Sequence, residues 1–251
     1  MQRLGEENVN KQGCLMKIIK YDNARSIVVK FSDKYKAEVH TDYRFFMEGS
    51  VKNPYFASVY DVGMIGQRYA VSINSKSIKE YDTWHGMLRR CYDKKYKEQH
   101  PTYKDVTCCD EWLNYENFYE WLHSQENFDK WLNGERWCLD KDILVKGNKV
   151  YSSETCCLVP QSVNKLFTKR ENCRGNLPIG VIKHKNKFAV QCCGGKNKHQ
   201  GYYETINEAF LKYKQNKEIV IKEIAQKEYD KGNITEECYK SMMLYKVEIT
   251  D

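Results

Sequence analysis

At 251 residues the chain exceeds one average domain and is long enough to bury a sizeable core. Its formal net charge of +7 and its 30% of charged residues indicate a well-solvated surface and favour polyanions as partners. No apolar run approaches the length of a membrane span and no secretory signal is evident at the start, so we expect a cytoplasmic protein with no membrane partner.

The first half of the chain predicts a small β module followed by two helices. Residues 1–12 are polar, and we expect them to fray. Apolar and polar residues then alternate through 13–56, with turn residues between the runs, which predicts a small antiparallel β module. Residues 57–78 form a connection. Apolar residues at helical spacing predict one helix around 81–91 and a second that begins with Asp110 as its N-cap.

Residues 137–169 predict two strands followed by a helix. A short strand carries Asp140 and Asp142 on one face, and a Gly-Asn turn at 147–148 leads to a second extended segment, 149–159. Pro160 then sets φ for the first turn of a helix that presents an asparagine. Oxygen ligands from a hairpin and a helix can hold a hard divalent cation, Mg²⁺ or Mn²⁺, against a phosphate. The expected metal ligands are Asp140, Asp142 and Asn164.

The last third of the chain predicts a basic sheet backed by a helix. Thr205 and Glu208 have the spacing of a capping box at the start of that helix. Residues 165–200 hold nine Lys or Arg and one acid, a net +8, so the other 215 residues sum to −1. Such a block is typical of polyanion binding, and a solvated basic face is the alternative reading. Strands are expected at 180–184, 187–192 and 201–203.

Eleven cysteines occur, and six of them form three adjacent pairs. Because neighbours on a strand point to opposite faces and no export signal is evident, we expect reduced thiols. No Cys-x-x-Cys spacing occurs, which argues against a structural zinc site. Four cysteines distant in sequence can still meet in space: Cys91, Cys109, Cys138 and Cys156.

The pattern from 137 to 169, with Asp-Lys-Asp on its first strand, resembles the ββα-metal core of HNH (His-Me finger) nucleases of phages and mobile introns. The resemblance extends upstream over 81–92 and 106–121. Downstream, 178–181 and 204–210 resemble an AP2-type DNA-binding domain. The resemblance implies an α+β fold in three parts: a small SH3-like antiparallel β module at 13–56, a central helical and ββα HNH-like domain at 78–170, and a three-stranded sheet plus helix, AP2-like, at 176–230.

The chain departs from the HNH pattern at the general base. Catalytic members carry a histidine where Lys141 stands, and a protonated lysine cannot accept a proton unless burial lowers its pKa by several units. His85, on the first predicted helix, is the substitute base, and a polar histidine on a helix surface is the alternative reading. The expected catalytic residues are therefore Asp140 and Asn164, which match the family's pattern, and His85, which is the substitute that this sequence offers.

In the AP2-type family the open face of the sheet enters the major groove of duplex DNA, where a ribbon of strands fits. Lysines on such a face mostly contact phosphate, whereas Gln191 can read an adenine edge. Either Arg89 or Arg90 on the first predicted helix can bind the scissile phosphate. The expected DNA-binding residues are Arg89, Arg90, Lys169, Arg170, Arg174, Lys183, Lys185, Lys187, Gln191 and Tyr202.

Three functions stay open at this point. One is a phage-type endonuclease whose metal-dependent cleavage of double-stranded DNA is weakened or lost because Lys141 replaces the base. Another is a DNA-binding protein without cleavage, with regulatory or anti-defence work in the host cytoplasm. The third is a protein-interaction factor that uses the same fold to inhibit a host enzyme.

Overall fold

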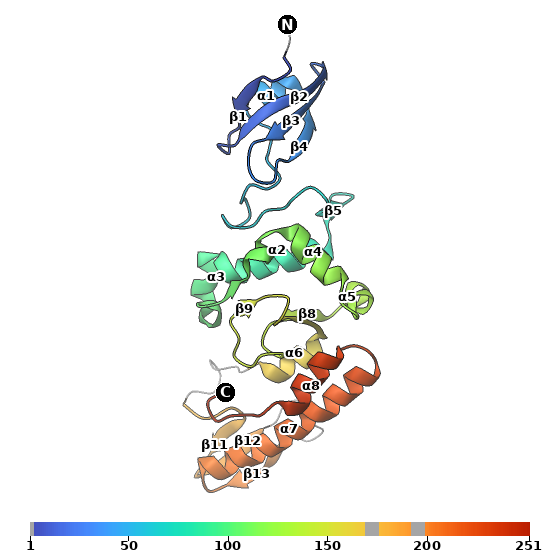
Figure 1. Cartoon of the computed structure of the whole chain (residues 1–251). Helices are drawn as coiled ribbons and strands as arrows, with labels where there is room; N and C mark the ends of the chain where they lie inside the picture. The colour runs from blue at the N-terminus through green and yellow to red at the C-terminus, as the bar shows by residue number, and fades with distance from the viewer. Residues whose placement is uncertain (1–2, 169–175, 192–198) are drawn as a thin grey trace. The chain divides into compact units, whose positions relative to one another are not determined.

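The computed structural model describes residues 3–168, 176–191 and 199–251 (Figure 1). Helices and several small sheets occur together, which confirms the expected α+β class. The chain divides into two compact units, Met1–Leu122 and His123–Asp251, and each is described by itself. This division falls inside the range 78–170. No helix within the described ranges is long and apolar enough to cross a membrane.

The first unit begins with a four-stranded antiparallel sheet in the order β1-β2-β3-β4, drawn in blue in Figure 1. Its buried face presents Met16, Ile18 and Val29 to Phe46 of helix α1. The expected β module is therefore present. The expected fraying is wrong for part of 1–12, because Asn8 pairs with Met16 across the sheet. The elements are β1 (Glu7–Val9), β2 (Leu15–Asn23), β3 (Ser26–Phe31), β4 (Glu38–Thr41) and α1 (Tyr43–Met47).

Short helices and hairpins complete the first unit. The first predicted helix is present as α2, and its apolar stripe is buried at Trp84, Leu88 and Cys91. Asp110 does not cap an α-helix. It opens a 3-10 turn, and Asn114 Oδ1 accepts the Glu116 N–H at 3.0 Å at the start of α4. The elements are β5 (Ser72–Ile73), β6 (Lys76–Ser77), α2 (Lys79–Tyr92), α3 (Lys94–Gln99), η1 (Pro101–Tyr103), β7 (Thr107–Cys108), η2 (Asp110–Leu113) and α4 (Tyr115–His123).

The second unit contains the strand, strand and helix expected between 137 and 169, with a different register. Strand β8 pairs with β10, so that Asp140 lies opposite Cys157, and residues 141–156 form the connection. The extended segment expected at 149–159 is broken at Ser152, whose carbonyl accepts the N–H of Cys156 at 3.1 Å. Pro160 ends β10 and precedes the helix. The elements are α5 (Phe128–Asn133), β8 (Trp137–Asp140), β9 (Val150–Tyr151), β10 (Cys157–Pro160) and α6 (Gln161–Phe167).

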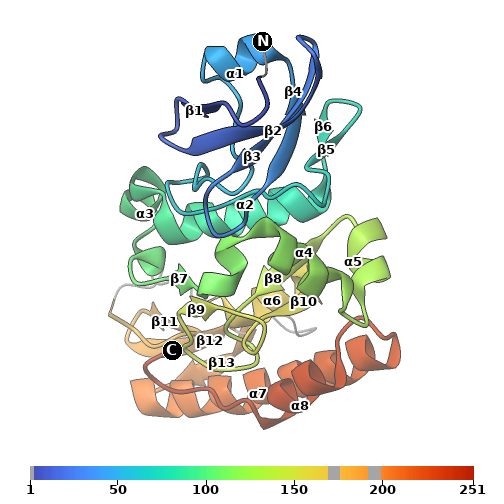
Figure 2. The same cartoon turned by 45° about the horizontal axis from the view of Figure 1, so that its top comes forward.

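Three antiparallel strands and two helices follow. The order β11-β12-β13 and the two-residue turn after His184 agree with the sequence pattern. The capping box of α7 is also confirmed, because the Thr205 hydroxyl and the Glu208 carboxylate each accept the other residue's N–H at 3.2 Å. Helix α8 was not expected, and it lies beside α7 (Figure 2). The elements are β11 (Val181–His184), β12 (Lys187–Gln191), β13 (His199–Tyr203), α7 (Ile206–Asp230) and α8 (Glu236–Leu244).

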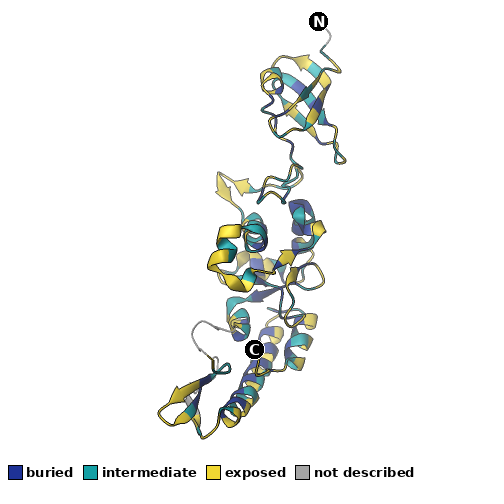
Figure 3. Cartoon of the chain, turned by 90° about the vertical axis from the view of Figure 1, so that its left-hand side faces the viewer, coloured by how far each residue is buried: buried dark blue, intermediate teal, exposed yellow. Residues whose placement is uncertain are grey.

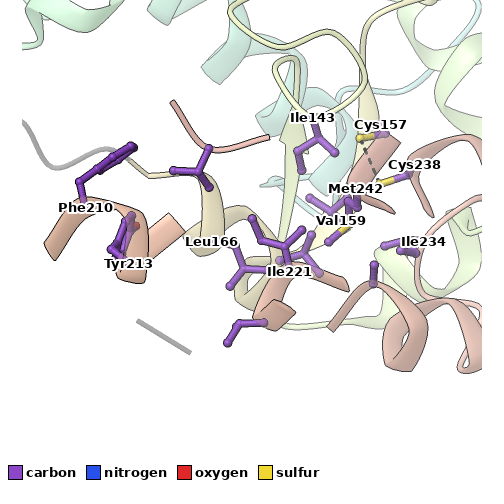
Figure 4. Close-up of a cluster of buried hydrophobic side chains, with 14 of the residues drawn as sticks. Ile143, Cys157, Val159, Leu166, Phe210, Tyr213, Ile221, Ile234, Cys238 and Met242 are labelled. Atoms are coloured by element: carbon purple, nitrogen blue, oxygen red, sulfur yellow. Dashed lines mark hydrogen bonds between the residues drawn. The ribbon is translucent and has the colours of Figure 1, made fainter. Parts of the chain in front are cut away.

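One hydrophobic core joins these elements of the second unit (Figure 4). It includes Val159 of β10, Leu166 of α6, Ile221 of α7 and Met242 of α8. The expected boundary between the HNH-like and AP2-like parts, at 170–176, falls within this unit, and both sides contribute side chains to the same core. Gly180 has φ +76°, and a Cβ there would lie 2.0 Å from the ring of Tyr213, so this position requires glycine.

Candidate functional site: the acidic loop and the basic sheet

The acidic loop, residues 140–149, is closed by its own polar groups. Asp140 is the last residue of β8, and its Oδ1 accepts the N–H groups of Asp142 at 2.7 Å and Ile143 at 3.0 Å. A carboxylate that caps the two residues after it produces a turn. The chain therefore leaves the strand at Asp140. The expectation that Asp140 and Asp142 share a face of one strand is wrong.

Lys141 is a buried member of the same loop. Its ammonium donates to the Asp142 carboxylate and to the Asn148 carbonyl, the latter at 3.0 Å. The Asn148 amide in turn donates to the carbonyls of Lys141 at 2.8 Å and Val150 at 2.6 Å. These bonds tie both ends of the loop together. Lys141 therefore acts as a structural cation in the loop.

Burial raises the pKa of Asp140 above its ordinary value of 3.8. The N–H groups of Asp142 and Ile143 lower this pKa, and the negative charge of Asp142 raises it further. The effect of burial on the pKa is larger than that of the hydrogen bonds, because both N–H groups bond to the same oxygen. A carboxylate needs several donors to offset its desolvation.

Lys146 attaches the acidic loop to residues 245–251. The Lys146 ammonium donates to the Lys246 carbonyl and to Asp251 Oδ2, both at 2.8 Å. It also lies 5.0 Å from the centre of the Tyr245 ring. Asp251 is buried and accepts the Glu248 N–H at 2.9 Å. Residues about 100 positions apart in the chain thus fix this loop in one conformation.

The expected metal ligands are not brought together by these bonds. Asn164 is half-buried on α6, and no hydrogen bond joins its amide to Asp140 or Asp142 in the part of the chain that the structure describes. Asp142 is paired with Lys141, and one Asp140 oxygen is engaged by backbone. Mg²⁺ usually keeps several waters and takes only one or two protein carboxylates, so the expected magnesium site stays a prediction.

Within residues 3–168, 176–191 and 199–251, no three histidine, cysteine, aspartate or glutamate side chains gather as a metal group. The eight cysteines described there are free thiols. Cys157 and Cys238 have their Sγ atoms 4.0 Å apart in the core (Figure 4), and hydrogen bonding with Cys238 and burial raise the pKa of the Cys157 thiol. The adjacent pair Cys192 and Cys193 lies outside the described residues.

His85 and the two arginines lie on α2, in the first unit. The His85 ring lies 5.0 Å from that of Tyr60 and 5.8 Å from that of Tyr81, so its surroundings are aromatic. Arg89 Nε lies 3.7 Å from Asp93 Oδ2. Arg90 is half-buried. No carboxylate contacts His85 among the described residues. The structure therefore does not show His85 as a general base that is oriented by a hydrogen-bonded acid.

The open face of the β11–β12–β13 sheet, called the open sheet face below, is the second candidate site. Residues opposite each other in antiparallel strands share a face. The pairs Ile182 with Ala189 and Ala189 with Tyr202 therefore define one face, and alternation adds residues to it. The other face packs against α7, where Val181 and Val190 are buried. The open sheet face consists of Ile182, His184, Lys187, Ala189, Gln191 and Tyr202.

Most of this face is exposed, as the yellow strands in Figure 3 show. Ile182 is 43% exposed and Tyr202 is 50% exposed. The rings of His184 and Tyr202 lie 4.9 Å apart across the sheet. Lys187 Nζ lies 2.6 Å from Glu204 Oε1, in a pair open to solvent. Apolar, aromatic, amide and basic groups are therefore presented together on one surface.

Two expected contacts lie elsewhere on the hairpin. Lys183 is exposed but pairs with Phe188, whose side chain packs against the core, so it lies on the face of the hairpin opposite to that of Lys187. Lys185 lies in the turn, with φ +52°. Lys169, Arg170 and Arg174 lie outside the described residues.

Sequence reasoning missed Ile182 and His184 on the open sheet face. Ala189 pairs with Tyr202 and Ile182 pairs with Ala189, and alternate residues of a strand share a face, so both residues lie on the face of Tyr202. This assignment requires the strand register. Comparison with models of protein families, with curated proteins and with solved structures finds no match to the chain.

Proposed function

We propose that the chain is a duplex-DNA-binding protein and that the open sheet face is the surface that enters the major groove. The observation that carries the proposal is a three-stranded sheet with a helix on one side and exposed polar and basic groups on the other. The major groove admits a β-ribbon, and side chains on alternate residues then reach base edges and phosphates.

The groups on this face divide into two roles. Gln191 has the amide that pairs with adenine in the major groove, and His184 offers ring nitrogens. The Tyr202 ring and the Ile182 side chain suit apolar contact with a thymine methyl. Lys187 suits phosphate, because its pair with Glu204 is exposed and exchanges readily. Base contacts supply sequence preference and the lysine supplies salt-dependent affinity.

Cleavage is not part of the proposal. Lys141 occupies the position of the usual base and is engaged in the loop, and Asp140 caps the turn that follows it. We propose that the acidic loop is a structural part of the second unit. This assignment would be reversed by cleavage of duplex DNA that requires Mg²⁺ or Mn²⁺. Such cleavage would be abolished by Asp140→Ala and unaffected by Lys187→Ala.

The test compares two lysines on opposite faces of one hairpin. Duplex binding by the full chain is measured by fluorescence anisotropy over a range of salt concentrations. Lys187→Ala should reduce the magnitude of the log–log salt slope by about 0.9, the value for one phosphate contact. Lys183→Ala removes the same charge from the same hairpin and serves as the matched control.

Base reading has its own readout. Gln191→Ala should leave the salt slope unchanged and weaken binding to a preferred duplex by about 1–3 kcal/mol, with reduced discrimination between sequences. The proposal fails if Lys183→Ala changes the slope as much as Lys187→Ala while Gln191→Ala changes nothing.

A further inference from the structure

A second concentration of positive charge lies in the first unit, far in sequence from the basic block. From Arg89 in the last turn of α2 to Lys104 after η1, the chain has six Lys or Arg and two acids, a net +4. The whole range 1–122 has 19 Lys or Arg and 17 Asp or Glu, a net +2, so its other residues sum to −2. We call residues 89–104 the α3 corner.

The α3 corner is internally braced. Asp93 ends α2 and caps α3, because its Oδ1 accepts the Tyr96 N–H at 3.0 Å. Lys97 Nζ donates to the carbonyls of Lys104 and Val106, both at 3.1 Å. The chain on either side of α3 is thus fixed to it by hydrogen bonds. A surface that is already ordered loses little entropy when it binds a partner.

Aromatic rings and basic side chains lie close together in the corner. The Arg89 guanidinium lies 4.8 Å from the centre of the Tyr96 ring, and the Tyr96 ring lies 4.2 Å from that of His100. The Tyr103 ring lies 5.8 Å from that of Tyr96. Aromatic groups among cations are found where proteins contact nucleic acid, since cations meet phosphate and rings meet sugar and base.

Three of the lysines are open to a partner. Lys94, Lys95 and Lys104 are exposed, and no ion pair engages them in the described part of the first unit. The two acids of the corner differ from each other. Asp93 accepts the cap hydrogen bond and pairs with Arg89, whereas Glu98 is exposed. Three exposed lysines against one exposed acid leave a net positive charge at the corner, and lysines contact phosphate as point charges.

We propose that the α3 corner is a second contact with DNA, in which Lys94, Lys95 and Lys104 bind the phosphate backbone of the duplex. This inference rests on the proposed function for its partner, and its residues belong to the first unit, whereas the open sheet face belongs to the second. The corner supplies affinity without base reading, because phosphate contacts from Lys94, Lys95 and Lys104 carry no sequence information.

The experiment removes two charges from the corner and two from elsewhere in the same unit. In the full chain, Lys94→Ala with Lys95→Ala should reduce the magnitude of the log–log salt slope by about 1.8, at 0.9 per contact. Between 50 and 200 mM salt the wild type should therefore lose about 12-fold more affinity than this variant. Lys11→Ala with Lys52→Ala, at two exposed positions of the β module, is the matched control and should leave the slope near that of the wild type.

Two further arms separate the possible failures. Lys94→Arg with Lys95→Arg should restore the wild-type slope, because charge rather than side-chain shape makes the contact. A slope change for the corner variant without one for Lys187→Ala supports the corner and overturns the open sheet face. Equal slopes for the corner variant and its control overturn the α3 corner, whether or not the sheet binds. A wild-type chain with no salt-dependent duplex binding overturns both.

Discussion

Glu116 in the first unit and Asp140 in the second are both carboxylates held by the fold, yet their pKa values shift in opposite directions. Glu116 is 2% exposed, and its burial alone raises its pKa. Hydrogen bonds from the Arg68 and Gln67 N–H groups and from the Arg68 guanidinium outweigh that effect, and the net pKa of Glu116 lies below its ordinary value. The pKa of Asp140 lies above its own because burial prevails there.

The difference comes from how many donors reach each carboxylate. Glu116 Oε1 accepts the N–H groups of Gln67 and Arg68, both at 2.8 Å, and Oε2 lies 3.0 Å from the Arg68 Nε. The Tyr55 hydroxyl donates to the same carboxylate at 3.1 Å. Gly66 permits this approach, because a Cβ there would lie 2.3 Å from the Glu116 carboxyl carbon. At Asp140 two N–H groups share one oxygen and Asp142 adds a repulsive charge.

Depth of burial does not by itself identify a reactive acid. Both carboxylates are used to fix local structure, one by closing the segment around Gly66 and the other by turning the chain after β8. The groups left open to a partner lie on the surface, on the open sheet face and at the α3 corner.

The largest effect is expected at Glu116. Glu116→Gln removes the negative charge and places an amide donor against groups that are themselves donors. The free energy of unfolding of the first unit should therefore fall by about 2–3 kcal/mol. Hydrogen-exchange mass spectrometry reads peptides of each unit separately and measures this loss. Glu120→Gln is the control: its pair with Arg68, at 2.6 Å, is half-exposed on both sides and should contribute less than about 1 kcal/mol. Equal losses for the two variants would contradict the role of Glu116.

The pH dependence should have opposite signs in the two units. A lowered pKa at Glu116 means that its contribution is present above the unfolded value of about 4.5 and is lost as the pH falls through the folded value. A raised pKa at Asp140 means that the folded state favours the protonated acid, so stability falls as the pH rises from about 3.8 through the folded value.

Each variant isolates its own carboxylate in this measurement. The protection lost in Glu116→Gln should shrink as the pH falls below about 4.5, and any gain in Asp140→Asn should grow as the pH rises above about 3.8. Comparing the variant with the wild type at each pH cancels intrinsic exchange. A gain that stayed constant across this range in Asp140→Asn would show that its pKa is not raised.

A smaller effect is expected from the turn at Asp140. Asp140→Ala leaves the N–H groups of Asp142 and Ile143 without their acceptor and should cost the second unit about 1–2 kcal/mol. Asp140→Asn keeps the amide oxygen as acceptor and removes the unfavourable charge, so the change should be within about 0.5 kcal/mol near neutral pH. If Asp140→Asn is as damaging as Asp140→Ala, the charge has a role beyond the turn.

The sequence was most informative where structure depends on neighbouring residues. Thr205 and Glu208 form the predicted capping box, and the alternation around Met16 and Val29 gives the predicted sheet. These features need only residues that are close in the chain, so spacing and residue type suffice. The turn after His184 was predictable for the same reason.

Features that depend on distant partners were not predictable. Asp142 was expected to continue the strand of Asp140, because no neighbouring residue reveals that β8 ends at Asp140. The end of the strand is set by the pairing of Asp140 with Cys157, at the start of β10. Glu116 was not recognised as a buried acid, since its partners Tyr55 and Arg68 lie about 50–60 residues earlier. Lys183 was assigned to the wrong face because its parity depends on the register that pairs it with Phe188.

The most direct test of the central claim asks which face of the sheet-and-helix layer contacts DNA. A photoreactive phenylalanine analogue placed at Tyr202 preserves an aromatic ring on the open sheet face, and the same analogue at Ile219 marks the exposed side of α7, where that residue is 54% exposed. Irradiation with duplex DNA should give a covalent adduct from position 202 and none from position 219. An adduct from position 219 with none from position 202 would contradict the account.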